Sequence, residues 1–163
     1  MERSTIGKVA AVAAIVAGAA AGLSAAAQAS PASDRAAFDR ALATHISAIK
    51  SRDIKTFEST LTDGDTLLFL LPDGRRSDTR AAFLAAHRQL FAMPGFIFED
   101  TPISEYVGSS VGTATVGVKV TMAGADGTAT VNRSVMTLTF QREMGDWRLV
   151  QDQHSPVAAA RPE

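Results

Sequence analysis

The stretch TATVNRSVMTLTFQREMGDWRLVQDQHS, residues 128–155, alternates between apolar and polar side chains on both sides of a turn at residues 143–145. A period of two places successive side chains on opposite faces of a β-strand, so this stretch predicts two strands joined by a hairpin. The same period continues upstream, with short glycine-containing connections. Four consecutive antiparallel strands are therefore expected at 96–107, 111–123, 128–142 and 146–155.

Upstream of Gly95, apolar residues recur three and four positions apart, which indicates amphipathic helices. A first helix starting near Asp34 would turn one stripe of side chains inward, formed by Phe38, Leu42, His45, Ile46 and Ile49. Asp53 is well placed to cap a short second helix, with inward residues Ile54, Phe57 and Leu61.

A short strand is expected at Thr66–Leu71, before the turn Pro72-Asp73-Gly74. Ser77 or Asp78 would then cap a third helix, whose inward face carries Phe83, His87, Leu90 and Phe91. Helices first and antiparallel strands afterwards predict an α+β fold. In this fold a curved antiparallel sheet, made of four long strands and one short strand, wraps around three N-terminal helices.

Residues 1–29 are predicted to be a signal peptide. Arg3 and Lys8 precede the uncharged stretch 9–23, and small residues at Ala27 and Ala29 favour cleavage before Ser30. The uncharged stretch is rich in alanine and shorter than the roughly 20 apolar residues that a spanning helix needs. The mature protein is thus expected to be exported, periplasmic or secreted, without membrane attachment. It would be a single domain over 30–163, with its core at about 34–156 and a loose tail from Val157.

The composition excludes several functions. The 163-residue chain has a formal net charge of −1, which gives no electrostatic support for binding nucleic acid. It has no cysteine, so disulfides and thiol catalysis are excluded. The three histidines are far apart in the sequence. The sequence contains neither a metal-binding motif nor a phosphate-binding loop. We therefore expect no metal and no cofactor.

Several short segments carry a resemblance to a known family: Ser51-Arg52-Asp53, Leu70-Leu71-Pro72-Asp73-Gly74, Ala125-Asp126-Gly127 and Gly145-Asp146-Trp147-Arg148-Leu149-Val150. Their order and spacing resemble the SnoaL-like branch of the nuclear transport factor 2-like superfamily, over residues 34–156. The resemblance implies a cone-shaped fold with a pocket that different members use for isomerisation, dehydration, epoxide hydrolysis or binding. Many relatives place a histidine six residues after the tryptophan, whereas this chain has Gln153 there and His154 one position later.

The last strand has two faces. Trp147 and Leu149 need burial, so the alternation predicts that one set faces inward and lines a pocket, namely Trp147, Gln151, Gln153 and Ser155. Tyr106, the single tyrosine, is added because ketosteroid isomerase chemistry on this fold uses a tyrosine. The alternative is that the polar residues mark only the place where the strand leaves the core.

His45 and His87 interrupt apolar helix stripes and are the candidate catalytic residues. A buried imidazole needs a partner or titrates at low pH, so each could be a neutral general base or a structural residue bonded within the core. Asp152 and His154 would lie on the outer face of the sheet, where a solvated or subunit-facing pair is expected instead of a catalytic one.

Binding of a small, largely apolar ligand in the cone pocket is the function that these features favour. One alternative is a cofactor-independent isomerase, lyase or hydrolase with a pocket histidine as general base. Another is an accessory interaction domain with a vestigial pocket. A homodimer could form through the outer sheet face, on which Lys119, Arg148, Val150, Asp152 and His154 are expected.

Overall fold

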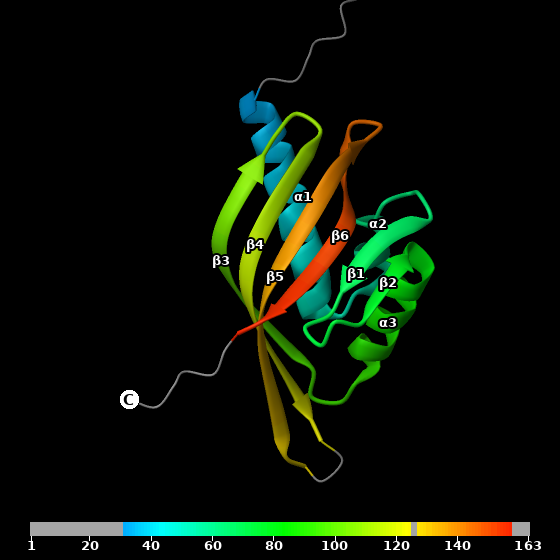
Figure 1. The fold of residues 1–163 in the computed structure, drawn as a ribbon, viewed down its shortest axis with the longest axis vertical. Helices are drawn as coiled ribbons and strands as arrows, with labels where there is room; N and C mark the ends of the chain where they lie inside the picture. Colours follow the sequence, from blue (N-terminus) through cyan, green and yellow to red (C-terminus); the bar gives the residue numbers. More distant parts are fainter. Residues whose placement is uncertain (1–30, 125–126, 158–163) are drawn as a thin grey trace, which may run out of the picture.

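The computed structural model describes residues 31–124 and 127–157, which form three helices and one six-stranded sheet (Figure 1). In chain order the elements are α1 (Pro31–Ser51), α2 (Ile54–Ser59), β1 (Thr66–Leu70), β2 (Arg76–Thr79), α3 (Arg80–Ala92), β3 (Ile97–Val107), β4 (Val111–Ala123), β5 (Ala129–Glu143) and β6 (Asp146–Pro156). The strand order in the sheet is β2-β1-β6-β5-β4-β3. The expected α+β class, with helices first and a long meander afterwards, is confirmed.

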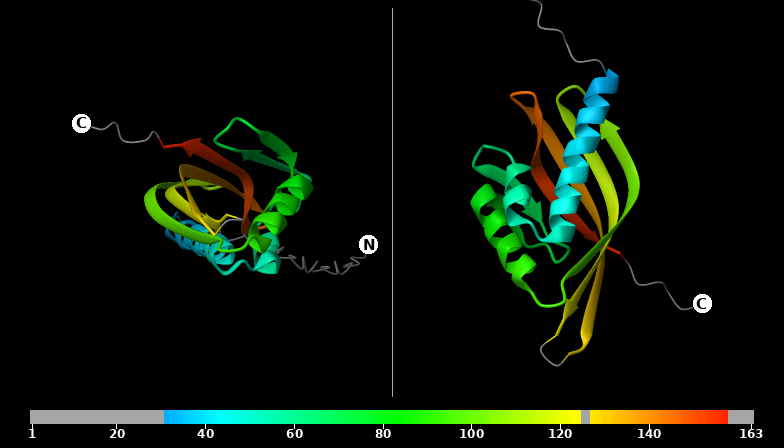
Figure 2. Two further views of the ribbon diagram at one scale, coloured as in Figure 1. Left: turned by 90° about the horizontal axis from the view of Figure 1, so that it is seen from below. Right: turned by 180° about the vertical axis from the view of Figure 1, so that it is seen from behind.

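The helices form where the apolar stripes predict them. The α1 stripe is buried from Phe38 to Ile49, and Asp53 caps α2 by accepting hydrogen bonds from the backbone N–H groups of Lys55 and Thr56. Helix α1 lies along the concave face of the sheet (Figure 2). Its ends are fixed there by two ion pairs, Asp34 with Arg142 (2.6 Å) and Lys50 with Asp100 (2.5 Å).

The start of α3 differs from the prediction. Residues 76–79 form strand β2, which pairs with β1 across the Asp73-Gly74 turn, and neither Ser77 nor Asp78 caps the helix. The cap is Thr79, whose hydroxyl accepts a hydrogen bond from the Ala82 N–H at 3.2 Å. The sheet therefore has two short strands instead of one. It is also not wholly antiparallel, because β1 pairs with β6 in parallel.

An extra residue interrupts the pairing of β5 with β6. Thr139 is opposite Gln151 and Phe140 is opposite Leu149, so Val150 has no partner across the ladder and forms a β-bulge. Before the bulge, Trp147 and Leu149 face the core. After it, the phase of the alternation changes, and Asp152 pairs with the fully buried Leu138. Odd-numbered residues of β6 therefore face inward before Val150, and even-numbered residues face inward after it.

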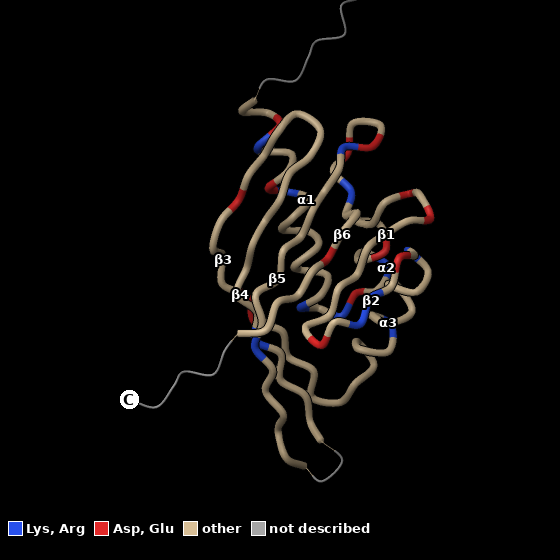
Figure 3. The backbone as a smooth tube through the Cα atoms, viewed as in Figure 1, with Lys and Arg blue, Asp and Glu red and all other residues tan. Residues whose placement is uncertain are grey.

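The β4–β5 hairpin extends past the rest of the molecule, at the end away from the start of α1 (Figure 1). Lys119 and Arg133 are register partners at its base, and beyond them the described part of the hairpin carries no charged side chain (Figure 3). The expected signal peptide and the tail beyond Val157 lie outside the described residues. Within the described part of the chain, no helix is long and apolar enough to cross a membrane.

Candidate functional site

A cavity of about 120 Å³ lies between the end of α1, helix α3, strand β1 and the inner face of the sheet. Most of its wall is apolar, formed by Ile49, Phe69, Leu71, Leu90, Phe98, Val120 and Met136. Three ionisable residues complete it, which are His87 from α3 and the two β6 residues Asp152 and His154. An apolar wall with a few convergent polar groups is the usual composition of a small-molecule site.

Asp152 and His154 form an ion pair inside this cavity, with His154 Nε2 at 3.2 Å from Asp152 Oδ1. The carboxylate is only 1% exposed. His154 Nδ1 lies 3.0 Å from the Ser134 hydroxyl oxygen, so both ring nitrogens have a partner. Burial alone would lower the pKa of His154, but the hydrogen bond and the negative charge of Asp152 outweigh burial and raise that pKa. His154 therefore keeps its positive charge to higher pH than a free histidine.

The pKa of His87 is shifted in the opposite direction. Its Nδ1–H donates to the Phe83 carbonyl oxygen, one helical turn earlier, at 3.0 Å. The neutral ring then carries its lone pair on Nε2. Burial lowers the pKa of His87, and Asp152 and the Phe83 carbonyl compensate only in part. The surroundings thus favour the neutral form of His87 and the protonated form of His154 beside Asp152.

Phe69 connects the two histidines. Its ring centroid is 5.7 Å from that of His87 and 6.1 Å from that of His154. Both imidazoles therefore border the same aromatic side chain of β1, and all three residues line the cavity.

His45, the other candidate base, is not part of the cavity lining. It is 0% exposed and lies in the aromatic core, with its ring centroid 4.8 Å from that of Phe57. The Thr60 hydroxyl donates to the Phe57 carbonyl (2.6 Å), so its oxygen must accept from His45 Nδ1–H (2.7 Å). Burial lowers the pKa of His45 to about 3. The structure therefore separates the two histidines and leaves His87 as the one that can meet a ligand.

The predicted pocket residues at the end of β6 need correction. Gln151 and Gln153 are opposite Thr139 and Thr137, and Ser155 is opposite Val135, all on the outer face of the sheet. The cause is the bulge at Val150, which exchanges the two faces for the rest of the strand. Asp152 and His154, expected outside, are inside instead.

The other two predicted pocket residues are also outside the cavity lining. Trp147 is buried as expected, 4% exposed, but it packs against Phe38 with ring centroids 5.5 Å apart, at the other end of β6. Tyr106 is 69% exposed and pairs with Thr113 on the outer face of β3 and β4. Neither residue belongs to the cavity.

Two signals in the sequence could have identified the inward pair. Leu149 and Val150 are adjacent apolar residues, which breaks a strict alternation. His154 also stands one position later than the histidine of the family pattern. One extra residue at the bulge accounts for both observations, because it returns His154 to the inner face.

A model of the SnoaL-like domain matches residues 39–160. The chain belongs to the SnoaL-like family. A comparison with curated proteins gave no match. The matched range contains the whole cavity, so the Asp152–His154 pair and His87 are parts of a SnoaL-like domain.

Solved structures share the fold of this SnoaL-like chain. A candidate dehydratase of the NTF2-like family from Streptomyces avermitilis has a TM-score of 0.67 at 18% identity, over 79% of this chain and 100% of that one. A ketosteroid isomerase-like protein from Erwinia carotovora atroseptica has a TM-score of 0.65 at 15% identity, covering 76% and 96%. An NTF2-like protein with a cystatin-like fold from Novosphingobium aromaticivorans has a TM-score of 0.61 at 21% identity, covering 78% and 84%. At these identities the likeness shows the fold alone.

The arrangement of groups in the cavity is suited to proton transfer. The neutral form of His87 can accept a proton at Nε2, and the protonated form of His154, which Asp152 favours, supplies a positive charge nearby. Among the described residues, no group of three or more histidine, aspartate or glutamate side chains is arranged to hold a metal ion.

Proposed function

We propose that this SnoaL-like domain is a cofactor-independent acid–base enzyme that acts on a small, largely apolar molecule with one oxygen function. The observation that carries this proposal is the Asp152–His154 ion pair, which shares a mostly apolar cavity with His87. A histidine and a carboxylate in contact within a water-poor site distinguish a catalytic cavity from a purely binding one.

The size and lining of the cavity define the substrate class. Its volume is about 120 Å³, and an apolar cavity of about 150 Å³ holds one benzene-sized molecule. The substrate is therefore of about that size, or the part of a larger molecule that enters the cavity is. The apolar body of the substrate would contact Phe69, Phe98 and Met136. The substrate oxygen would face the ion pair of Asp152 and His154 on β6.

The two histidines have different roles in this proposal. His87 Nε2 takes a proton from a carbon next to the substrate oxygen function and becomes an imidazolium. The negative charge that develops on the substrate oxygen is favoured by the positive His154, which Asp152 keeps protonated. His87 then returns its proton to another carbon, which is isomerisation, or to a departing hydroxyl group, which is elimination of water.

Solvent deuterium exchange tests this function without knowledge of the natural substrate. A panel of small cyclic ketones and enones is incubated with the protein in D₂O, and deuterium incorporation next to the carbonyl is followed by NMR. We expect catalysed exchange for at least one member, and a loss of about 10²–10⁴-fold in His87→Gln. Asp152→Asn should reduce exchange as well, since His154 loses the charge that keeps it protonated.

Gln153→Ala is the matched control, because it changes an outward residue on the same strand and should exchange as the wild type does. Wild-type exchange equal to that of His87→Gln would contradict the catalytic proposal. Saturable binding of a panel member without deuterium exchange would contradict the catalytic function. It would indicate a binding protein that uses the same cavity.

We also propose that the protein works outside the cytoplasm. The support is the sequence of residues 1–29, in which two basic residues precede an uncharged stretch and a small-residue cleavage site. N-terminal sequencing of the protein from the culture medium or periplasm should give Ser30 as the first residue. Recovery of the full-length chain in the cytoplasm would contradict export.

A further inference from the structure

A second hollow, a groove of about 310 Å³, lies at the other end of β6 from the cavity. Its walls are the middle of α1, the end of α2 and the turn between β5 and β6. The polar groups around it include Arg40, Ser59, Asp146, Trp147 and Arg148. None of these residues lines the cavity with His87.

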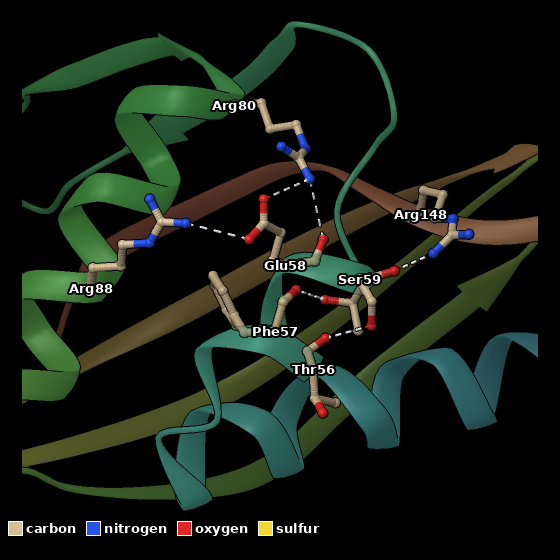
Figure 4. Close-up of polar contacts among 8 residues, drawn as sticks. Thr56, Phe57, Glu58, Ser59, Arg80, Arg88 and Arg148 are labelled. Atoms are coloured by element: carbon tan, nitrogen blue, oxygen red, sulfur yellow. Dashed lines mark hydrogen bonds and ion pairs between the residues drawn. The ribbon is translucent and has the colours of Figure 1, made fainter.

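Arg148 is held in a fixed orientation in this groove. One terminal guanidinium nitrogen donates to the Ser59 carbonyl oxygen at the end of α2, as Figure 4 shows. The other lies 3.3 Å from the Asp146 carboxylate, which is on the exposed rim. Its Nε is buried and has no hydrogen-bond partner among the described residues. Arg148 therefore has donor capacity that the protein does not use.

Glu58, the nearest acidic residue of α2, does not neutralise this site. Its carboxylate is turned to the opposite side of α2, toward Arg80 and Arg88, each at 3.4 Å (Figure 4). The positive charge of Arg148 is thus opposed mainly by the exposed Asp146. Because the Asp146 side chain is 75% exposed, water weakens this pair.

Two further donors border the groove. Arg40 extends from α1 and, within the part of the chain that the structure describes, has no ion pair. Trp147 is buried, and its indole N–H has no hydrogen-bond partner among the described residues. A buried donor without a partner costs about 1–3 kcal/mol, so an acceptor at this position would be favoured.

We propose that this groove binds a small oxyanion, with Arg40 and Arg148 as the charged ligands and the Trp147 indole N–H as a neutral donor. Guanidinium groups recognise carboxylate and phosphate oxygens by directed hydrogen bonds. The α1 wall is formed by the small residues Ala37 and Ala41, which leave room for an apolar body. The favoured class is therefore the carboxylate of a small apolar acid, and inorganic phosphate is the source of the same chemistry without that body.

Trp147 is the single tryptophan of the chain, so its indole N–H gives one NMR signal located at the proposed site. Titration of the full protein with benzoate should shift this signal saturably, with a dissociation constant in the millimolar range or below, and phosphate should bind more weakly. Sodium chloride at equal ionic strength is the control for general screening. A shift of the same size with chloride would overturn the proposal.

Arg40→Gln and Arg148→Gln should each weaken benzoate binding by about tenfold or more. Arg40 is exposed, so its variant should fold normally, whereas Arg148→Gln also removes a hydrogen bond to α2. Arg88→Gln is the matched control, since Arg88 lies on the other side of α2, and it should bind as the wild type does. Binding by Arg40→Gln equal to wild type would overturn the proposal, as would a loss of equal size in Arg88→Gln.

His87→Gln separates this proposal from the proposed catalytic function. That variant should retain the full shift of the Trp147 signal, because the cavity and the groove share no lining residue. A lost shift in His87→Gln would mean that benzoate acts through the cavity, and it would contradict a separate oxyanion site.

Discussion

His45 shows how a buried residue makes stability depend on pH. Its pKa is lowered from 6.5 to about 3 by burial, so the unfolded chain binds a proton that the folded chain rejects. The contribution of His45 to the free energy of unfolding is therefore fully present above pH 6.5 and is lost as the pH falls from 6.5 toward 3. Between these two pH values the free energy of unfolding falls by about 1.4 kcal/mol per pH unit. His87, whose pKa is also lowered, contributes with the same sign.

We predict that His45→Leu loses less stability in acid than the wild type does. Leucine fills the aromatic core without a titratable group, and the Thr60 hydroxyl keeps its bond to the Phe57 carbonyl. Urea unfolding measures the free energy of unfolding at pH 7 and at pH 5. The decrease between these two pH values should be about 2 kcal/mol smaller in the variant than in the wild type. Equal losses in the two proteins would show that His45 can be protonated in the folded state.

Asp152→Asn should lower the pKa of His154. Burial remains in the variant, but the negative charge that raises this pKa is removed, and the amide oxygen of asparagine is a weaker hydrogen-bond acceptor than the carboxylate. NMR titration of the imidazole Cε1–H signals measures the change, with Asp146→Asn as the control because Asp146 is exposed on the same strand. An unchanged His154 titration would contradict the ion pair.

His154 makes the stability of the protein depend on pH in the opposite direction to His45. A raised folded-state pKa gives stability that is fully present below pH 6.5 and is lost as the pH rises through the raised pKa. The wild type should therefore lose this contribution as the pH rises above 6.5 and through the raised pKa, and Asp152→Asn should not. The contributions of His45 and His154 thus fall off on opposite sides of pH 6.5.

At the scale of elements, the bulge in β6 determines which residues form the site. Deletion of Val150 removes the extra residue and leaves Leu149, Asp152 and His154 on the inner face. We predict that this variant folds with a stability loss of about 1–2 kcal/mol and retains the raised pKa of His154. NMR titration and urea unfolding measure both properties.

Deletion of Gln153 is the matched comparison. It also shortens β6 by one residue, but it turns His154 outward and leaves Asp152 buried without its partner. Loss of one partner of a buried pair costs about 3–5 kcal/mol, and the His154 pKa should return toward 6.5. If both deletions behaved alike, the bulge would not determine the faces of the strand.

For the molecule as a whole, the outer face of the sheet is the surface that we propose for a homodimer, and its composition differs from the expected one. Asp152 and His154 face inward and Arg148 is bound to α2, so the central outer face is formed by uncharged residues. These residues are Thr113, Thr115, Thr137, Thr139, Gln151 and Gln153. A polar, uncharged face is suited to a modest interface.

We predict a weak homodimer through this face. Light scattering at micromolar concentration should show a dimer in exchange with monomer, and Thr137→Arg should shift the population to monomer because two arginines would meet near the symmetry axis. Arg88→Gln, away from the sheet, is the control. A wild type that is monomeric at these concentrations would remove this interface.

The class of fold and most of its elements follow from local patterns in the sequence. Strand periods, helix stripes and the Asp53 cap depend on neighbours within one turn or one hairpin, and such local preferences can be counted along the chain. The burial of Phe38, Ile49 and Trp147 was predicted for the same reason, and the structure confirms it. His87 was among the two candidate bases because it interrupts an apolar stripe.

The polar groups that meet in the cavity depend on contacts between distant parts of the chain. A bulge depends on the register of the partner strand, so the bulge at Val150 and the exchange of faces beyond it required the pairing of β6 with β5. Strand β2 forms because β1 provides its hydrogen bonds, and β1 joins β6 in parallel across a long separation in sequence. The cavity that brings α3 and β6 together results from these non-local pairings, which no local period encodes.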